Sequence, residues 1–219
     1  MIDWGFVATY GPHLVQACWI TLVVSAISLA LSTLLGLAIA LLRISPTRPL
    51  WGAAWTYIWI VRGTPLLLQL FAIYYALPAA GLRIGPWEGG ILALSLNSSA
   101  YFAEIFRGAI RAVPTGQAEA AYAVGMMPGQ ALWRIVLPQA ARPALPPYIG
   151  QAITLVKNSS LVSVISVPDL MLTAQSIYSS TYKVVEVMLM TGLLYLLMTS
   201  LLQIAQSVLE RRLGYYTVR

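Results

Sequence analysis

Charged residues are scarce in this sequence. Only 9% of its 219 residues are Asp, Glu, Lys or Arg, whereas roughly a quarter are charged in a typical soluble domain. Hydrophobic residues make up 59% of the chain, and the mean hydropathy is +0.77. No polar stretch is long enough to form a separate domain. The composition therefore excludes an ordinary soluble domain and predicts one integral membrane domain over residues 1–219.

Cysteine and histidine are nearly absent, since Cys18 and His13 are the only residues of their kinds. One cysteine cannot form an intrachain disulfide, and we expect no metal or other cofactor in this chain. The sequence also lacks the phosphate-binding pattern GxxxxGK[ST], so we expect no ATP hydrolysis by the chain alone. The apolar stretches also contain no cluster of His, Asp and Glu of the kind that a membrane enzyme would need for catalysis.

Acidic residues are fewer than basic ones, which gives a formal net charge of +6. In a soluble protein such an excess can indicate binding to nucleic acid. Here the arginines fall between apolar stretches and form no basic face, so we expect a signal for membrane topology and no nucleic-acid partner. The residues before the first apolar stretch include Asp3 but no Lys or Arg, unlike a secretory signal, so we expect a permanent first span.

Long apolar stretches are what the sequence does contain. A membrane-spanning helix needs about 20 mainly apolar residues. We assign five spans, namely 14–42, 51–82, the shorter stretch between Glu88 and Glu104 that ends with Arg107 and Arg111, the stretch after Arg142 that continues through Lys157 to about 167, and 187–209. In the second stretch Trp51, Trp55 and Trp59 recur every four residues and so share one helical face. We predict an all-α membrane protein with about five transmembrane helices.

The basic residues predict the orientation of these helices. With the N-terminus outside, the inner segments hold nine basic residues and the outer segments two, Arg83 and Lys183. The nine inner residues are Arg43, Arg48, Arg107, Arg111, Arg134, Arg142, Arg211, Arg212 and Arg219. Because cytoplasmic loops carry the excess of Lys and Arg, we place the N-terminus outside and the C-terminus in the cytoplasm.

The longest segment outside the predicted spans, about 112–138, faces the cytoplasm in this topology. Residues 117–124 (QAEAAYAV) favour a helix, and Gly125 can adopt the left-handed conformation that ends one. We expect Pro128 to reinforce that stop and Pro138 to close the amphipathic stretch GQALWRIVLP. A short helix beneath the membrane either packs on the protein's own inner surface or docks into a partner.

This segment resembles the cytoplasmic signature of permease subunits in binding-protein-dependent ABC importers. The signature has Glu-Ala-Ala, three residues, Gly, nine residues, Ile, one residue and Leu-Pro. Its counterparts at the same spacing are Glu119, Ala120, Ala121, Gly125, Ile135, Leu137 and Pro138. The resemblance implies the transmembrane fold of a type I importer, with these residues forming a coupling helix that docks into an ATPase.

Three further stretches resemble the polar amino-acid branch of that family, which includes permeases for glutamine, histidine, arginine, cystine and glutamate. They are Arg62-Gly-Thr-Pro-Leu66 with Gln69, Asn97-Ser-Ser-Ala-Tyr101 followed by Glu104 and Arg107, and Lys157-Asn-Ser-Ser-Leu161. From these stretches the candidates for the substrate pathway are Arg62, Thr64, Pro65, Gln69, Asn97, Tyr101, Lys157, Asn158 and Ser159.

The resemblance also implies the working assembly. Two permeases, identical or closely related, would form the pathway in a bacterial inner membrane, in contact with its lipid. Two ATPase subunits would bind ATP and magnesium below them, and an extracytoplasmic binding protein would deliver a polar amino acid. An importer for another solute, such as an osmolyte, and an ion-coupled secondary transporter are the alternatives; the second would require inverted repeats and carboxylates within the membrane.

For several residues the sequence leaves two alternative positions or roles open. Arg62 lies either at the membrane interface or in the pathway, and Pro65 either frees the carbonyl of Val61 for a ligand or only kinks the helix. Glu104 pairs with either Arg107 or Lys157. Because many relatives have Asp where this chain has Asn158, the sequence weakly disfavours a cationic amino acid as substrate.

Overall fold

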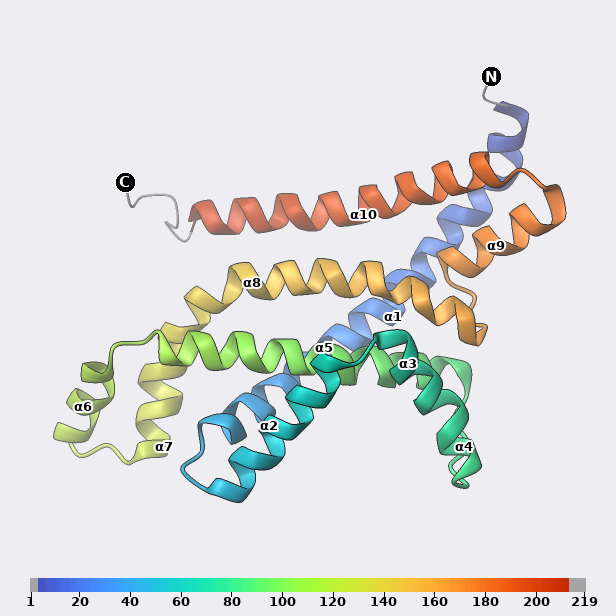
Figure 1. The fold of residues 1–219 in the computed structure, drawn as a ribbon. Helices are drawn as coiled ribbons and strands as arrows, with labels where there is room; N and C mark the ends of the chain where they lie inside the picture. The colour runs from blue at the N-terminus through green and yellow to red at the C-terminus, as the bar shows by residue number, and fades with distance from the viewer. Residues whose placement is uncertain (1–3, 213–219) are drawn as a thin grey trace.

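The computed structural model describes residues 4–212, the last of them by its backbone only, and every regular element among them is helical (Figure 1). Arg219, used above for the orientation, lies outside the described residues. Here η1 and η2 are π-helical and η3 is a 3₁₀-helix. The elements are α1 (Trp4–Ile44), α2 (Arg48–Gly63), α3 (Leu66–Phe71), η1 (Ala72–Ala76), α4 (Leu77–Ala79), α5 (Pro86–Arg111), α6 (Thr115–Ala123), α7 (Pro128–Ala131), η2 (Leu132–Val136), α8 (Leu137–Asn158), η3 (Ser159–Ile165), α9 (Leu170–Thr181) and α10 (Val184–Arg212).

Two of these helices, α1 and α10, are long and apolar enough to cross a membrane. Two bent pairs of helices bring the number of candidate spans among the described residues to four. The predicted third span corresponds to α5, whose 26 residues extend about 39 Å at 1.5 Å per residue. This helix is less apolar because it contains buried Ser and Asn residues as well as Glu104 and Arg107. The five-span count and the orientation stay predictions.

The long helix α1 packs across α5 through a face of small residues (Figure 1). The buried small residues of α1 include Ser25, Ser28, Ser32, Gly36 and Ala40, and of these Gly36 and Ala40 lie against Ala103 of α5. Small residues let two helices approach closely in a membrane. The approach is tightest at Gly36, where an added Cβ would lie 2.7 Å from the Cβ of Phe102. The pair α1–α5 forms the centre against which α2, α3 and α8 pack.

The chain between Trp51 and Leu82, expected as one run, is broken. α2 ends at Gly63, and the helical stretch from Leu66 to Ala79 leaves at an angle of 109°. Thr64 and Pro65 between them have extended backbone conformations. The break follows from Pro65, which has no N–H for a helical bond and disfavours the helical conformation at the preceding residue.

The expectation that Pro138 closes a helix is wrong. The chain runs through this residue from η2 directly into α8, so that Pro138 lies in the first turn of α8. The π-helical turn immediately before it provides the reason, because a widened turn relieves the clash of a proline ring with the carbonyl four residues earlier. The same arrangement recurs at Pro78, which follows η1.

A second bend of 53° separates the stretch from Pro128 to Ile165 and α9. Ser166 adopts a left-handed conformation with φ 67°, and Asp169 caps α9 by accepting a hydrogen bond from the Leu172 N–H at 2.9 Å. The sequence interpretation assigned no helix to α9, although Asp at the N-cap is a recognised start signal. Asp169 is fully buried, and the hydroxyl of Tyr195 donates to its second oxygen at 3.4 Å.

Candidate functional site

The helix α6, the turn after it and α7 form a hairpin at the end of α5 (Figure 1), which we call the α6–α7 hairpin, residues 115–131. Gly125 has φ +83°, the left-handed conformation that glycine adopts without strain. The Gly125 N–H donates to the Tyr122 carbonyl at 2.9 Å, and the Met126 N–H donates to the Ala121 carbonyl at 3.0 Å. These two bonds form a Schellman motif, so the prediction for Gly125 is confirmed.

The two sides of the hairpin differ in exposure. Ala121 is buried and Ala118 packs against a cluster that contains Ala109 and Ile110 of α5. Glu119, Ala120 and Gly125 are exposed on the other side. At the tip, three apolar side chains are also largely exposed: Tyr122 by 48%, Val124 by 76% and Met127 by 71%. The hairpin therefore presents an apolar tip, which we call the hairpin tip, while its small residues hold it to α5.

The second half of the cytoplasmic motif joins the hairpin to α8. Leu137 packs in the same cluster as Ala109, Ile135 is half-buried, and Pro138 is exposed. The side chain of Gln139 donates to the Gln117 amide oxygen at 3.1 Å and to the Ile135 carbonyl at 3.0 Å. This cross-link between α6 and α8 makes the hairpin and the start of α8 one packed unit.

A polar network fills the break between α2 and α3. The Gln69 side-chain amide lies 2.8 Å from the Val61 carbonyl, 2.8 Å from the Thr64 hydroxyl and 3.1 Å from the Thr64 carbonyl, all acceptors for its two hydrogens. The Thr64 hydroxyl in turn donates to the Ile60 carbonyl at 2.9 Å. Pro65 does free the Val61 carbonyl, but Gln69 occupies it. Of the two alternatives for Pro65, this hydrogen bond favours a kink that Gln69 stabilises, because the Val61 carbonyl already has a donor within the chain.

The network extends into the central helix through Asn97, which is 5% exposed. Its side-chain amide donates to the Gln69 amide oxygen at 3.1 Å. Since Asn97 lies near the middle of the 26-residue α5, the break is attached halfway along a helix about 39 Å long. The structure thus brings together Thr64, Pro65, Gln69 and Asn97.

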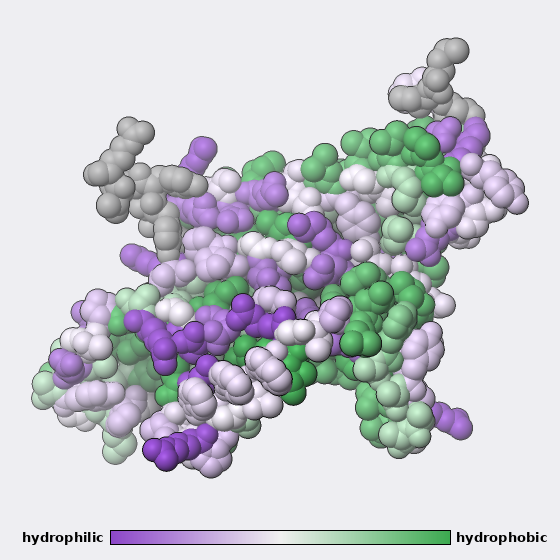
Figure 2. Space-filling model, viewed as in Figure 1, coloured by the Kyte–Doolittle hydropathy of each residue, from purple (hydrophilic) through white to green (hydrophobic). Residues whose placement is uncertain are grey.

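Beside this network lies a groove between α2, α5 and α8. The Arg62 guanidinium lies 5.3 Å from the centre of the Tyr101 ring. Glu104 accepts two hydrogen bonds from Arg107, from Nε at 3.0 Å and from Nη2 at 2.6 Å, so it pairs with Arg107 and not with Lys157. Figure 2 shows hydrophilic side chains gathered over this part of α5.

Two adjoining cavities, of about 500 and 410 Å³, make up the groove and share Arg62, Tyr101 and Glu104 as lining residues. Gln151 of α8 also lines the larger cavity. The sequence interpretation missed Gln151, and it discussed Glu104 without assigning it to the pathway. The position of Gln151 in the sequence does not predict a place in the groove, because only the packing of α8 against α5 brings its side chain to the larger cavity.

The third motif, Lys157 to Leu161, lies at the end of α8 and the start of η3. Lys157 is exposed and Asn158 is half-buried at the end of α8. Ser159 is fully buried, and its hydroxyl donates to the Val156 carbonyl at 2.8 Å. None of the hydrogen bonds between described residues links these side chains to the network around Gln69. The structure therefore does not bring this motif together with the other two.

The tryptophan stripe on α2 is confirmed. The rings of Trp51 and Trp55 stack at 6.4 Å, and those of Trp55 and Trp59 at 6.0 Å, with interplanar angles of 6° and 5°. Trp55 and Trp59 line the smaller cavity of the groove. Among the described residues, no group of three or more His, Cys, Asp or Glu side chains is placed to hold a metal ion.

Comparison with known proteins gives one family. Residues 32–215 match the model of the binding-protein-dependent transport system inner membrane component. The chain is 42% identical over 193 residues to the probable glutamine ABC transporter permease protein GlnM of Bacillus subtilis, covering 88% of this chain and 89% of that protein. It is 37% identical over 220 residues to the L-cystine transport system permease protein TcyB of the same organism, covering 100% and 94%.

Solved structures agree with the fold. An amino acid ABC transporter crystallised with histidines superposes with a TM-score of 0.89 and 37% sequence identity, over 97% of this chain and 99% of that one. The methionine ABC transporter MetNI in an inward-facing conformation gives a TM-score of 0.78 at 24% identity, over 91% and 95% of the two chains. The second comparison supports the fold alone.

Proposed function

Since the chain belongs to the family of binding-protein-dependent transport system inner membrane components, we propose that it imports a polar amino acid as the permease subunit of an ABC importer. The amino-acid permeases at 37–42% identity and the amino acid transporter at a TM-score of 0.89 support this class of substrate. An extracytoplasmic binding protein delivers the substrate, and a separate ATPase binds ATP and magnesium and supplies the energy.

The observation that carries the proposal is the exposed apolar hairpin tip, Tyr122, Val124 and Met127, at 48, 76 and 71% exposure. A helix of nine residues such as α6 is too short to be stable in water by itself, yet here a Schellman turn and the contacts to α5 hold it rigidly. Exposed apolar patches of this kind mark protein interaction sites. The tip is the contact with the ATPase, and Glu119 beside it contributes a charged rim.

The groove along α5 supports the translocation role. Helices interrupted at membrane depth are typical of transporter binding sites, where irregular backbone lines a cavity. The break at Thr64 and Pro65 meets the middle of α5 at Asn97, and the groove beside it carries Arg62 and Tyr101. Uncharged and cationic groups of this kind suit the carboxylate of an amino acid. Arg62 is therefore assigned to the pathway and not to the membrane interface.

A second permease completes the pathway. The groove is open on one side of the chain, and the charged groups Arg62 and Glu104 that line it are costly to expose to lipid. A second copy of this chain, or a close relative, covers the groove and turns it into a channel. Two ATPase subunits then dock on the two hairpin tips.

Uptake into proteoliposomes tests the proposal. The permease is reconstituted with its ATPase and binding protein, and a panel of radiolabelled polar amino acids is offered with ATP inside the vesicles. We expect uptake of one or a few amino acids, dependent on the ATPase and on the binding protein. Uptake that continues without the ATPase, driven by an ion gradient, contradicts the proposal. Uptake of an osmolyte and of no amino acid leaves the importer class standing and overturns the substrate class.

The same preparation tests the hairpin. Glu119→Lys and Gly125→Asp place a reversed charge and a side chain on the exposed side of the hairpin. We expect uptake to fall in both variants while membrane insertion, measured by the amount of folded permease recovered, stays unchanged. Unaltered uptake in both variants leaves transport in place but contradicts the coupling role.

A further inference from the structure

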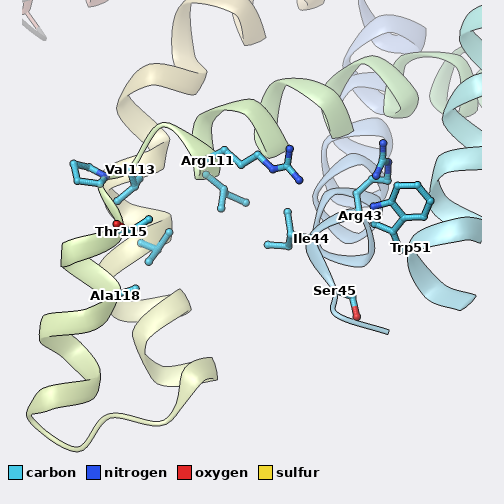
Figure 3. Close-up of a pocket in the computed structure, with 11 residues that line it drawn as sticks. Arg43, Ile44, Ser45, Trp51, Arg111, Val113, Thr115 and Ala118 are labelled. Atoms are coloured by element: carbon cyan, nitrogen blue, oxygen red, sulfur yellow. The ribbon is translucent and has the colours of Figure 1, made fainter. Parts of the chain in front are cut away.

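A basic cavity of about 530 Å³ lies next to the groove, where the ends of α1 and α5 meet the starts of α2 and α6 (Figure 3), and Arg43 lines both this cavity and the smaller cavity of the groove. Arg43 from the last turn of α1 and Arg111 from the last turn of α5 line it. Figure 3 shows the Arg111 side chain extending toward the side of the cavity that Arg43 occupies. Two guanidinium groups from helices far apart in the sequence thus border one space.

No carboxylate lines this cavity, although Arg43 also borders the smaller cavity of the groove, which Glu104 lines. The lining residues include no Asp or Glu, and the ion pair found within residues 4–212 joins Glu104 to Arg107 instead. The Nε atom of Arg43 is buried without a hydrogen-bond partner. A buried donor on a charged group is costly to leave unpaired, and no carboxylate among residues 4–212 pairs with Arg43 or Arg111, so these two side chains favour an anion in the cavity that they line.

Other groups around the cavity suit the same anion. The hydroxyl of Ser45 accepts a hydrogen bond from the Thr47 N–H at 3.2 Å and keeps its own proton for donation. α6 begins at Thr115 on the cavity wall, and a helix N-terminus carries partial positive charge that favours a phosphate group. Arginine is also the side chain best matched to phosphate, through two parallel hydrogen bonds.

The surroundings favour a lipid as the source of that phosphate. The Arg43 guanidinium lies 4.6 Å from the centre of the Trp51 ring, which is the first ring of the stacked stripe continuing through Trp55 to Trp59. Tryptophans concentrate where a membrane meets water. Arg43 and Arg111 end two predicted spans on the predicted cytoplasmic side, whose leaflet carries the anionic lipids that basic pockets between helices bind.

The size and lining of the cavity agree with this source. At about 530 Å³ it falls in the range of sites that bind whole small molecules, so it has room for a headgroup in addition to its phosphate. Ile44, Ile110 and Val136 form apolar parts of the wall that can contact the glycerol backbone. We propose that this cavity binds the phosphate headgroup of an anionic phospholipid of the inner leaflet, through Arg43 and Arg111.

The test is lipid binding to the full-length permease, purified in detergent, followed by native mass spectrometry during titration with phosphatidylglycerol. Phosphatidylcholine, which has no net charge, is titrated in parallel, and inorganic phosphate is added as a competitor. We expect phosphatidylglycerol to bind in preference, and inorganic phosphate at equal concentration not to displace it. Each of Arg43→Gln and Arg111→Gln is expected to weaken binding about fivefold, the effect of one basic residue near an anionic surface.

Two control variants make the assignment specific. Arg142→Gln removes an exposed arginine on the same predicted side that does not line this cavity, and binding is expected to stay unchanged. Arg43→Lys keeps the charge and is expected to recover most of the binding lost in Arg43→Gln. Coincident elution profiles and melting temperatures of all variants confirm that they are folded.

Three results overturn the proposal. Equal binding of the two lipids would show that the site does not select an anionic headgroup. Displacement of the lipid by inorganic phosphate at equal concentration would show that the site binds a free anion. If Arg43→Gln and Arg111→Gln bind the lipid normally but fail to copurify with the ATPase, the cavity belongs to an acidic group of that subunit. None of these results depends on amino-acid uptake, so the proposal can fail while the transport function stands.

Discussion

The side-chain amide of Gln69 lies 2.8 Å from the carbonyl oxygen of Val61, the carbonyl that Pro65 leaves without its helical donor. A glutamine eight residues further along the chain thus replaces the missing N–H. The other end of the same amide accepts a hydrogen bond from Asn97 of the central helix. The break between α2 and α3 is therefore held in a fixed position on α5.

Gln69→Leu is expected to destabilise this break. The substitution leaves the Val61 carbonyl and the Asn97 amide without their partner, and an unsatisfied buried polar group costs about 1–3 kcal/mol. The melting temperature of the purified permease and the initial rate of amino-acid uptake should both fall. Gln203→Leu on the exposed side of α10 makes the same chemical change away from the break and should alter neither. Equal melting temperatures for Gln69→Leu and wild type contradict this role.

Gly125→Ala is expected to weaken the hairpin. A Cβ at Gly125 meets no atom within 4 Å, so the penalty comes from φ +83° alone, which costs a residue with a side chain about 1–2 kcal/mol. ATP-driven uptake should fall, and Gly125→Asn should retain more of it because Asn tolerates this conformation. Gly116→Ala, within α6 and also in open space, is the matched control and should leave uptake unchanged. The prediction fails if Gly125→Ala and Gly116→Ala behave alike.

Gly36→Ala is expected to separate α1 from α5. The added Cβ would lie 2.7 Å from the Phe102 Cβ and 3.1 Å from the Ser99 carbonyl oxygen. Since one of these atoms belongs to the backbone, the helices must move apart, at a cost of about 1–3 kcal/mol for overpacking. Thermal unfolding in detergent measures it. Gly192→Ala on α10, where no atom lies within 4 Å, should unfold like wild type, and a similar result for Gly36→Ala would show that the α1–α5 contact is looser than described.

The partner of Glu104 can be identified by double-mutant cycles on the melting temperature. Glu104 and Arg107 share two hydrogen bonds at side-chain exposures of 22 and 20%, so we expect a coupling energy at the lower end of about 0.5–3 kcal/mol. Glu104 and Lys157 have no such contact, and their effects should add within about 0.5 kcal/mol. Coupling of Glu104 to Lys157 in place of Arg107 contradicts the arrangement in the groove.

The sequence alone predicted the features that depend on local chemistry. Gly125 ends α6 in the left-handed conformation, and Trp51, Trp55 and Trp59 share one face of α2. Both features depend only on residues close together in the sequence, which set where a helix ends and which side chains share a face. The long apolar runs likewise predicted α1 and α10. Three of their four ends lie within three residues of the observed ends, and α1 begins ten residues earlier than expected. The cytoplasmic segment predicted at about 112–138 follows the predicted third span, and the α6–α7 hairpin does follow α5 in the structure.

Features that depend on packing could not be predicted in this way. Whether the Val61 carbonyl stays free was decided by Gln69, and the choice between Arg107 and Lys157 for Glu104 was decided by side-chain geometry. Gln151 enters the groove only because α8 packs on α5. The π-helical turn before Pro138 has no pattern in the sequence, so the stop expected at that residue followed from proline chemistry alone.

Val124 is the most exposed apolar side chain of the hairpin tip, at 76%, and is the position from which docking to the ATPase is best tested. Val124→Asp places a charge on the apolar tip without disturbing a buried contact, and Val124→Ile keeps the tip apolar. The measurement is ATP-driven uptake in proteoliposomes, together with the amount of ATPase that copurifies with the folded permease. We expect Val124→Asp to lose both uptake and copurification of the ATPase, and Val124→Ile to retain both. Normal uptake and normal copurification with Val124→Asp would contradict docking of the ATPase at the hairpin tip.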